Sequence, residues 1–226
     1  MIELIPKPRT LCEWLDYIER IHPSNIEMGL DRLNLVKSSL NFSFSFPIIS
    51  VSGTNGKGSV CAILESILSH AGYRVGCYTS PHILRYNERV RIDQKEVGDD
   101  ELCEAFKIIE AARVNSNVPL TYFEFGTLAA MELIAKAEVD IAILEVGLGG
   151  RLDAVNIFDA ECAVLTNIDY DHTEYLGDTR EKIGFEKAGI FRSGKTAICS
   201  DTSPPSSISQ RATSIGSEVN FIGKHV

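Results

Sequence analysis

The sequence predicts an α/β fold of three layers, in which a mostly parallel sheet carries helices on both faces. Two observations predict it. Short apolar segments typical of buried strands alternate with segments of helical spacing, and the first of these strands ends in a glycine-rich turn that leads into a helix. In such sheets ligands bind at the carboxyl ends of the strands, so the polar residues found there are the candidate functional residues.

The composition is that of a globular chain. The 226 residues carry 22 Lys or Arg against 31 Asp or Glu, a formal net charge of −9, and 44% of them are hydrophobic, which excludes disorder. The acidic balance argues against binding nucleic acid or a membrane surface through bulk charge. An anionic ligand would therefore need a local positive field or a metal ion. The longest uncharged run, 38–56, is broken by Asn, Pro, Gly and Ser residues and predicts no membrane span.

The termini and the cysteines favour a cytoplasmic chain. The N-terminal segment lacks the apolar core of a secretion signal, and no lipidation motif is present. The six cysteines are scattered without a CxxC pair. We therefore expect them to be reduced and mostly buried, and we expect no zinc site.

Two helices are predicted before the first strand. Thr10 can cap a helix over 10–21, in which apolar residues follow helical spacing, and a second helix is predicted over 30–40. The run 46–51 predicts the first buried strand. The pattern over 59–71 predicts the helix that follows it, which a glycine ends.

The remainder alternates between strands and helices. Apolar segments predict further strands at 74–79, 139–146 and 162–167, with a short one at 195–199. Helical spacing predicts helices at 99–114, 123–137 and 179–191. From residue 201 the sequence is rich in Ser and Pro, which predicts a loop or linker, and 218–222 suits one more short strand.

The strongest functional motif joins the first strand to its helix. Its residues are Gly53, Thr54, Asn55, Gly56, Lys57, Gly58 and Ser59. Glycines let backbone N–H groups approach phosphate oxygens, the helix N-terminus adds its dipole, and the lysine can meet the β- and γ-phosphates. The spacing GxxGKGS departs from the common GxxxxGK[ST] pattern, and a flexible turn with a solvated lysine is the alternative. The strand before the motif and the helix after it favour phosphate binding.

Other strand ends also carry polar residues. Glu145 closes an apolar strand, where nucleotide-binding folds hold Mg²⁺, although a carboxylate there can also cap the next helix. His172 follows another strand and, taken alone, is more often structural than a metal ligand. Ser80 follows a third and offers a hydroxyl, while the charged residues after it are by default a solvated face. Lys187, near the end of a helix, by default favours the helix dipole.

Taken together, these segments resemble the folylpolyglutamate synthase family, which is grouped with the Mur ligases. The resemblance rests on SGTNGKGS, YTSPHILRYNERVRI, LTYFEFGTLAAMELI, ILEVGLGGRLDAVN, DHTEYLG and EKAGIFR, in that order, and it extends from about residue 15 to residue 192. It points in particular to the bacterial bifunctional members. The fold implied is a three-layer, P-loop NTPase-like sheet of the Mur ligase central-domain type.

The resemblance implies an ATP-dependent amide ligase. In that chemistry ATP phosphorylates a carboxylate of dihydropteroate or a reduced folate, and the amino group of L-glutamate then displaces phosphate from the acyl phosphate. ATP and Mg²⁺ are the implied cofactors, with two magnesium sites. The pterin substrate and glutamate complete the partners, and the family implies a monomer that binds neither nucleic acid nor membrane.

The functional positions of the family carry over residue by residue. The resemblance implies that 53–59 form the ATP loop, that Ser80, Glu145 and His172 bind Mg²⁺, and that Lys187 is carbamylated. Lys57, His172 and Lys187 are the implied catalytic residues. The implied pterin-binding residues are Asn25, Ile26, Glu27, Met28, Thr121, Tyr122, Phe123, Glu124, Leu152, Asp153 and Ala154.

Members of this family carry a second, Rossmann-like domain after the ATPase domain. We expect residues 1–200 to form the ATP- and pterin-binding N-terminal domain, 201–226 to be an incomplete end of it or a linker, and the C-terminal domain to be absent. Such a chain would have little ligase activity by itself. Two alternatives stay open. One is a stand-alone P-loop kinase or NTPase, and the other is a non-catalytic remnant that binds nucleotide without turnover.

Overall fold

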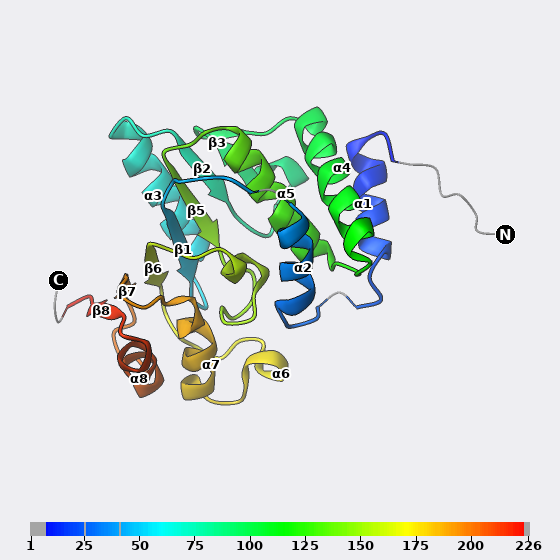
Figure 1. Cartoon of the computed structure of the whole chain (residues 1–226). Helices are drawn as coiled ribbons and strands as arrows, with labels where there is room; N and C mark the ends of the chain where they lie inside the picture. The colour runs from blue at the N-terminus through cyan, green and yellow to red at the C-terminus, as the bar shows by residue number, and fades with distance from the viewer. Residues whose placement is uncertain (1–7, 25, 41, 224–226) are drawn as a thin grey trace.

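The computed structural model describes residues 8–24, 26–40 and 42–223. Within these residues, eight strands form one sheet in the order β4-β3-β2-β5-β1-β6-β7-β8 (Figure 1). The strands are β1 Ile48–Ser52, β2 Val75–Tyr78, β3 Val90–Ile92, β4 Lys95–Glu96, β5 Ile141–Glu145, β6 Cys162–Leu165, β7 Thr196–Cys199 and β8 Glu218–Phe221. The strands β2, β5, β1, β6, β7 and β8 pair in parallel in that order. At the β2 edge, β3 pairs antiparallel with β2 and β4 pairs antiparallel with β3.

Helices cover both faces of this sheet. They are α1 Leu11–Arg20, α2 Asp31–Ser39, α3 Lys57–His70, α4 Asp99–Ser116, α5 Tyr122–Lys136, α6 Thr173–Leu176, α7 Arg180–Lys187 and α8 Ser206–Ile215. On one face α3 packs against the central strands. On the other face α5 packs against the sheet, α4 against α5, and α1 and α2 against α4 (Figure 1).

Residues along β5 show how the two faces separate. Ile143 packs with Cys61 of α3, whereas its neighbours Ala142 and Leu144 belong to the larger core that α4 and α5 share. This alternation is the period of two that a strand imposes on its side chains. All three side chains are fully buried, so the strand reads as a continuous apolar segment. The predicted three-layer α/β fold is confirmed.

The strand register aligns the carboxyl ends that carry the candidate residues. In the parallel ladder Val51 pairs with Glu145, Tyr78 with Leu144, and Ser52 with Leu165. The residues that follow β1, β2, β5 and β6 therefore emerge at one edge of the sheet, where parallel α/β sheets bind ligands.

The loop predicted after residue 201 is wrong over Ser206–Ile215, where helix α8 forms and leads into the predicted strand β8. The N-terminus of α8 is capped from outside, because the Glu181 carboxylate of α7 accepts the N–H groups of Ser206 at 2.9 Å and Ser207 at 2.7 Å. Ile208 and Ala212 of α8 are buried. A Ser- and Pro-rich sequence carries no local sign of this tertiary cap.

Other differences from the sequence expectations are small. The short strands β3 and β4 and the short helix α6 were not predicted. The helix expected over 179–191 ends at Lys187 and continues as a 3-10 turn, Ala188–Ile190. All six cysteines are free, and four are buried. Among the described residues, no helix has both the length and the apolar character needed to cross a bilayer.

Candidate active site

The glycine-rich loop, residues 53–59, connects β1 to α3. Gly53 has a φ of 144°, and a Cβ at this position would lie 1.8 Å from the Oγ1 of Thr166 and 3.0 Å from its backbone nitrogen. Gly56 has a φ of 83° and directly precedes Lys57, the first residue of α3. A side chain would be strained at both glycines, and at Gly53 it would also collide with the segment after β6.

Backbone donors of the loop divide into two groups. Thr54 and Asn55 donate their N–H groups to Asn167, to its carbonyl and its Oδ1 respectively, both at 2.8 Å. The first intrahelical hydrogen bond of α3 runs from the N–H of Val60 to the carbonyl of Gly56 at 3.0 Å. The N–H groups of residues 57–59 lie before it and have no acceptor within the helix. The backbone donors of that first turn and the helix dipole can attract an anion.

Two lysines converge on one carbonyl of this loop. Lys57 Nζ donates to the oxygens of Gly53 at 3.1 Å and Thr54 at 3.2 Å, and Lys187 Nζ donates to the same Gly53 oxygen at 2.9 Å. Lys187 is 3% exposed. Burial, with a smaller contribution from the nearby charge of Lys57, lowers the pKa of Lys187 to about 8. The two lysines thus create a local positive field at the loop. An anionic ligand would need such a field in a chain whose net charge is negative.

Ser80 and Glu145 meet across β2 and β5. The N–H of Ser80 donates to Glu145 Oε2 at 3.0 Å, and a Cβ at Gly58 would lie 3.7 Å from Glu145 Oε1. The extra glycine of the GxxGKGS spacing therefore faces this carboxylate. Burial raises the pKa of Glu145, opposed by the Ser80 hydrogen bond and by the charge of Lys57.

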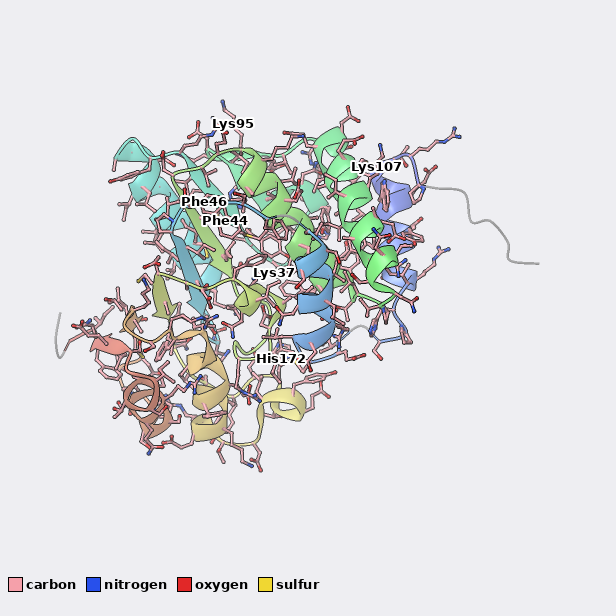
Figure 2. All side chains as sticks on the ribbon, in the orientation of Figure 1. Lys37, Phe44, Phe46, Lys95, Lys107 and His172 are labelled. Carbon is pink, nitrogen blue, oxygen red and sulfur yellow. The ribbon has the colours of Figure 1, made fainter. Side chains whose placement is uncertain are left out.

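His172 lies on the loop that leads into α6 (Figure 2). It has a φ of 46°, its side chain is about half exposed, and its Nε2 lies 3.6 Å from Asp171 Oδ1. In the part of the chain that the structure describes, no three His, Cys, Asp or Glu side chains gather into a metal site by themselves. A magnesium site would therefore combine the hydroxyl of Ser80 and the Glu145 carboxylate, which are hard oxygen ligands, with the His172 imidazole.

A cavity of about 600 Å³ opens beside these groups. Its lining includes Lys57, Ser80 and His172. It also includes every implied pterin-binding residue that the structure describes, namely Ile26, Glu27, Met28, Thr121, Tyr122, Phe123, Glu124, Leu152, Asp153 and Ala154. Asn25 lies outside the described residues. Three separate segments of sequence thus form one cavity that continues to the glycine-rich loop.

Asp153 is a buried carboxylate in this cavity. It accepts the N–H groups of Leu148 at 2.8 Å and Val155 at 3.0 Å. Burial outweighs these hydrogen bonds and raises the pKa of Asp153 to about 7. Because this pKa lies near neutral pH, the carboxyl group can either donate or accept a hydrogen bond there. This suits the implied pterin ring, whose edge carries both donors and acceptors.

The raised pKa predicts a pH-dependent stability. The folded protein binds a proton at Asp153 more tightly than the unfolded chain does, so this group's contribution to the free energy of unfolding falls as pH rises from about 4 to about 7. Asp153→Asn is expected to remove that fall, and chemical unfolding at several pH values measures it. The control is Asp159→Asn, at a carboxylate whose side chain is 88% exposed. An unchanged pH profile in Asp153→Asn would contradict the assignment.

The cavity also contains residues that the sequence analysis missed: Leu15, Asp16, Glu19, Pro81, Arg89, Gly147 and Leu148. Arg89 was expected on a solvated face, but it is 8% exposed, its Nε donates to His82 Nδ1 at 2.9 Å, and its guanidinium lies 5.5 Å from the centre of the Tyr122 ring. For Arg89 the solvated-face expectation is wrong, because its guanidinium packs over the rings of Tyr86 and Tyr122, whereas Arg85 is exposed as expected. The one sequence signal was the position of Arg89 shortly after Ser80.

Comparison with known proteins agrees with this architecture. Residues 51–225 match the Mur ligase middle domain. The chain belongs to the Mur ligase family. This membership argues against the stand-alone P-loop kinase alternative, and the sheet order and helix layers described above are those of a Mur ligase middle domain.

Several similar proteins are named dihydrofolate synthase/folylpolyglutamate synthase. The chain is 51% identical over 207 residues to dihydrofolate synthase/folylpolyglutamate synthase of Escherichia coli, which covers 91% of this chain and 49% of that protein. The structure of E. coli FolC in complex with DHPP and ADP superposes with a TM-score of 0.93 at 48% identity, covering 96% of this chain and 52% of the other.

A second structure extends the comparison to a metal. The bifunctional folylpolyglutamate synthase/dihydrofolate synthase from Yersinia pestis, complexed with AMPPNP and Mn ion, has a TM-score of 0.89 at 48% identity and covers 94% of this chain and 52% of the other. The Mur ligase chain described here thus spans about half the length of these relatives.

Proposed function

We propose that this Mur ligase chain forms the ATP- and pterin-binding part of an ATP-dependent amide ligase that adds L-glutamate to dihydropteroate, to folates, or to both. One observation carries the proposal: a single cavity joins the implied pterin residues to Lys57, Ser80 and His172. The names and ligands of the relatives support the same substrates.

In this reaction the substrate carboxylate attacks the γ-phosphorus of ATP, the bond to the β,γ-bridging oxygen breaks, and ADP leaves. The amine of glutamate then attacks the acyl phosphate, loses a proton, and expels phosphate as the amide forms. Both steps bring negative groups together, so cations must offset the repulsion. Lys57 supplies one such charge, and the N–H groups in the first turn of α3 supply donors for the phosphates.

Ser80, Glu145 and His172 would hold the magnesium that accompanies ATP. Bound there, the ion would neutralise phosphate charge and orient the transferred group. Glu145 is oriented by the N–H of Ser80, so the two proposed ligands hold each other in place before any ion binds. Asp153 and Tyr122 line the same cavity as Lys57, and their proposed role is to hold the ring while the substrate carboxylate reaches Lys57.

We propose that Lys187 is the residue modified by CO₂. A neutral amine attacks CO₂ and loses a proton to give a carbamate, and a pKa of about 8 makes the neutral amine far more available than for an exposed lysine. The ammonium of Lys187 donates a hydrogen bond to the Gly53 carbonyl, and formation of the carbamate would break this bond.

Labelled bicarbonate tests this modification. In ¹³C NMR spectra recorded with ¹³C-bicarbonate above pH 8, the pKa of Lys187 being about 8, we expect one carbamate resonance from a buried site. Lys187→Met is expected to remove it. Lys182→Met changes an exposed lysine paired with Asp178 and is expected to keep the resonance. A spectrum of the unsubstituted chain with no such resonance would refute the modification.

The small-molecule partners would be dihydropteroate or a reduced folate, L-glutamate and ATP. We propose that the chain is cytoplasmic, which the free and mostly buried cysteines support, and that it is a monomer, as the family resemblance implies. Light scattering on the purified chain measures its mass in solution.

Calorimetric titration tests the proposed function. We expect the chain to bind Mg·ADP and dihydropteroate, each without displacing the other, because their proposed sites adjoin but do not overlap. ATP hydrolysis that proceeds at full rate without a pterin would instead support an NTPase. Nucleotide binding with no affinity for dihydropteroate would support the non-catalytic remnant.

A further inference from the structure

Arg32, in the first turn of α2, connects two walls of the cavity. Its guanidinium contacts Glu124 through Nη2 to Oε1 at 2.8 Å and through Nε to Oε2 at 3.2 Å. It also contacts Glu27, through Nη1 to the carboxylate at 2.5 Å and through Nη2 to the backbone oxygen at 2.6 Å. Glu124 lies in the first turn of α5, whereas Glu27 lies in the segment before α2.

Both carboxylates line the cavity, on different elements. Glu124 is 4% exposed and also accepts the N–H of Thr121 at 2.8 Å, so the α5 end of this connection is fixed. Glu27 is half exposed, and its other oxygen lies 3.2 Å from His22 Nε2. The position of the outer wall, residues 26–28, therefore depends on polar contacts, and Arg32 makes most of them.

The helix that carries Arg32 is held independently. Leu33 and Val36 of α2 are fully buried in the main core. Gly29, with a φ of 148°, turns the chain between Glu27 and Arg32, and a Cβ there would approach Arg32 Nη1 at 4.0 Å. Loss of the guanidinium would thus free residues 26–28 while α2 stays in place.

We propose that Arg32 is a positioning residue that sets the width of the pterin end of the cavity, an inference that rests on the proposed function. A planar guanidinium can serve two carboxylates and a carbonyl in fixed directions at once, which the single ammonium of lysine cannot do. It also neutralises two carboxylates that would otherwise repel the carboxylate of the substrate.

Arg32→Lys, which keeps the charge and loses the fork, tests this role. Titration with dihydropteroate is expected to show affinity reduced at least about tenfold, which corresponds to about 1.4 kcal/mol. Affinity for Mg·ADP is expected to stay within about twofold, because the glycine-rich loop lies on other elements. A merely structural defect would lower both affinities.

Arg113→Lys is the matched control. Arg113 makes a comparable pair with Glu110, through Nε at 2.7 Å and Nη2 at 2.8 Å, with a side chain 17% exposed against 15% for Arg32. It lies outside the cavity lining. We expect both of its affinities to match those of the unsubstituted chain.

Dihydropteroate binding by Arg32→Lys within about twofold of the unsubstituted chain would overturn the inference. If Arg32→Lys does not fold, as judged by circular dichroism, Glu27→Gln replaces it, because this substitution at a half-exposed position keeps the size of the side chain and removes the charge that pairs with Arg32. Weaker pterin binding with intact Mg·ADP binding then supports the inference, and unchanged pterin binding refutes it. Failure of the unsubstituted chain to bind dihydropteroate would refute the proposed function itself, and the role of Arg32 with it.

Discussion

Replacing Gly53 by alanine is expected to lower the free energy of unfolding by roughly 3 kcal/mol and to remove nucleotide binding. The new Cβ would meet Thr166 at its hydroxyl, its Cβ and its backbone nitrogen, at 1.8, 2.9 and 3.0 Å. Rotation of the Thr166 side chain relieves only part of this overlap. Because the loop lies directly against the segment after β6, the strain would also move Lys57 and the first turn of α3. Denaturant unfolding and titration with Mg·ADP measure the two effects.

Gly56→Ala is the control for this prediction. Gly56 also has a positive φ, 83°, but nothing lies within 4 Å of its hypothetical Cβ. We expect a cost of about 1 kcal/mol from backbone strain alone. Equal unfolding midpoints for Gly53→Ala and the unsubstituted chain would show that the loop is not packed against Thr166 as described.

Lys57→Met is expected to weaken Mg·ADP binding roughly 10- to 100-fold, the usual range for losing a hydrogen bond to a charged group. Methionine keeps the length of the apolar stem but has no charge to offer the phosphates. The substitution should also raise the pKa of Lys187, because the charge of Lys57 helps to lower it. Calorimetry measures the affinity, and the pH at which the Lys187 carbamate forms reports its pKa.

Lys182→Met serves again as the reference, since it removes one positive charge from an exposed site. It should leave nucleotide affinity unchanged. If Lys57→Met and Lys182→Met bind Mg·ADP equally well, the glycine-rich loop is not the phosphate site.

The sequence was sufficient to predict the architecture because its signals are local. Buried parallel strands read as apolar segments, and the glycine-rich motif before α3 has a recognisable order. The candidate residues at the ends of β2, β5 and β6 could be grouped in advance, since parallel strands place their carboxyl ends at one edge. The register agrees with this prediction: Val51 pairs with Glu145 and Tyr78 with Leu144, so the ends of β1, β2 and β5 are level.

What could not be predicted depends on contacts distant in sequence. Helix α8 is capped by Glu181, 25 residues before Ser206. Arg89 and Arg32 are charged residues that local rules place in solvent. Arg89 is buried and Arg32 is partly buried because aromatic or acidic partners arrive from other elements. The pterin-binding residues were implied by the family resemblance alone. Residue spacing could not predict them, because the three segments that carry them share no sequence pattern.

The most direct test of the account is a crystal structure of this Mur ligase chain soaked with dihydropteroate and Mg·ADP. The account predicts the pterin ring beside Asp153 and Tyr122, the benzoate carboxylate directed toward Lys57, and the phosphates at the first turn of α3. Density for the pterin outside the cavity, or for the nucleotide within its pterin end, would contradict it.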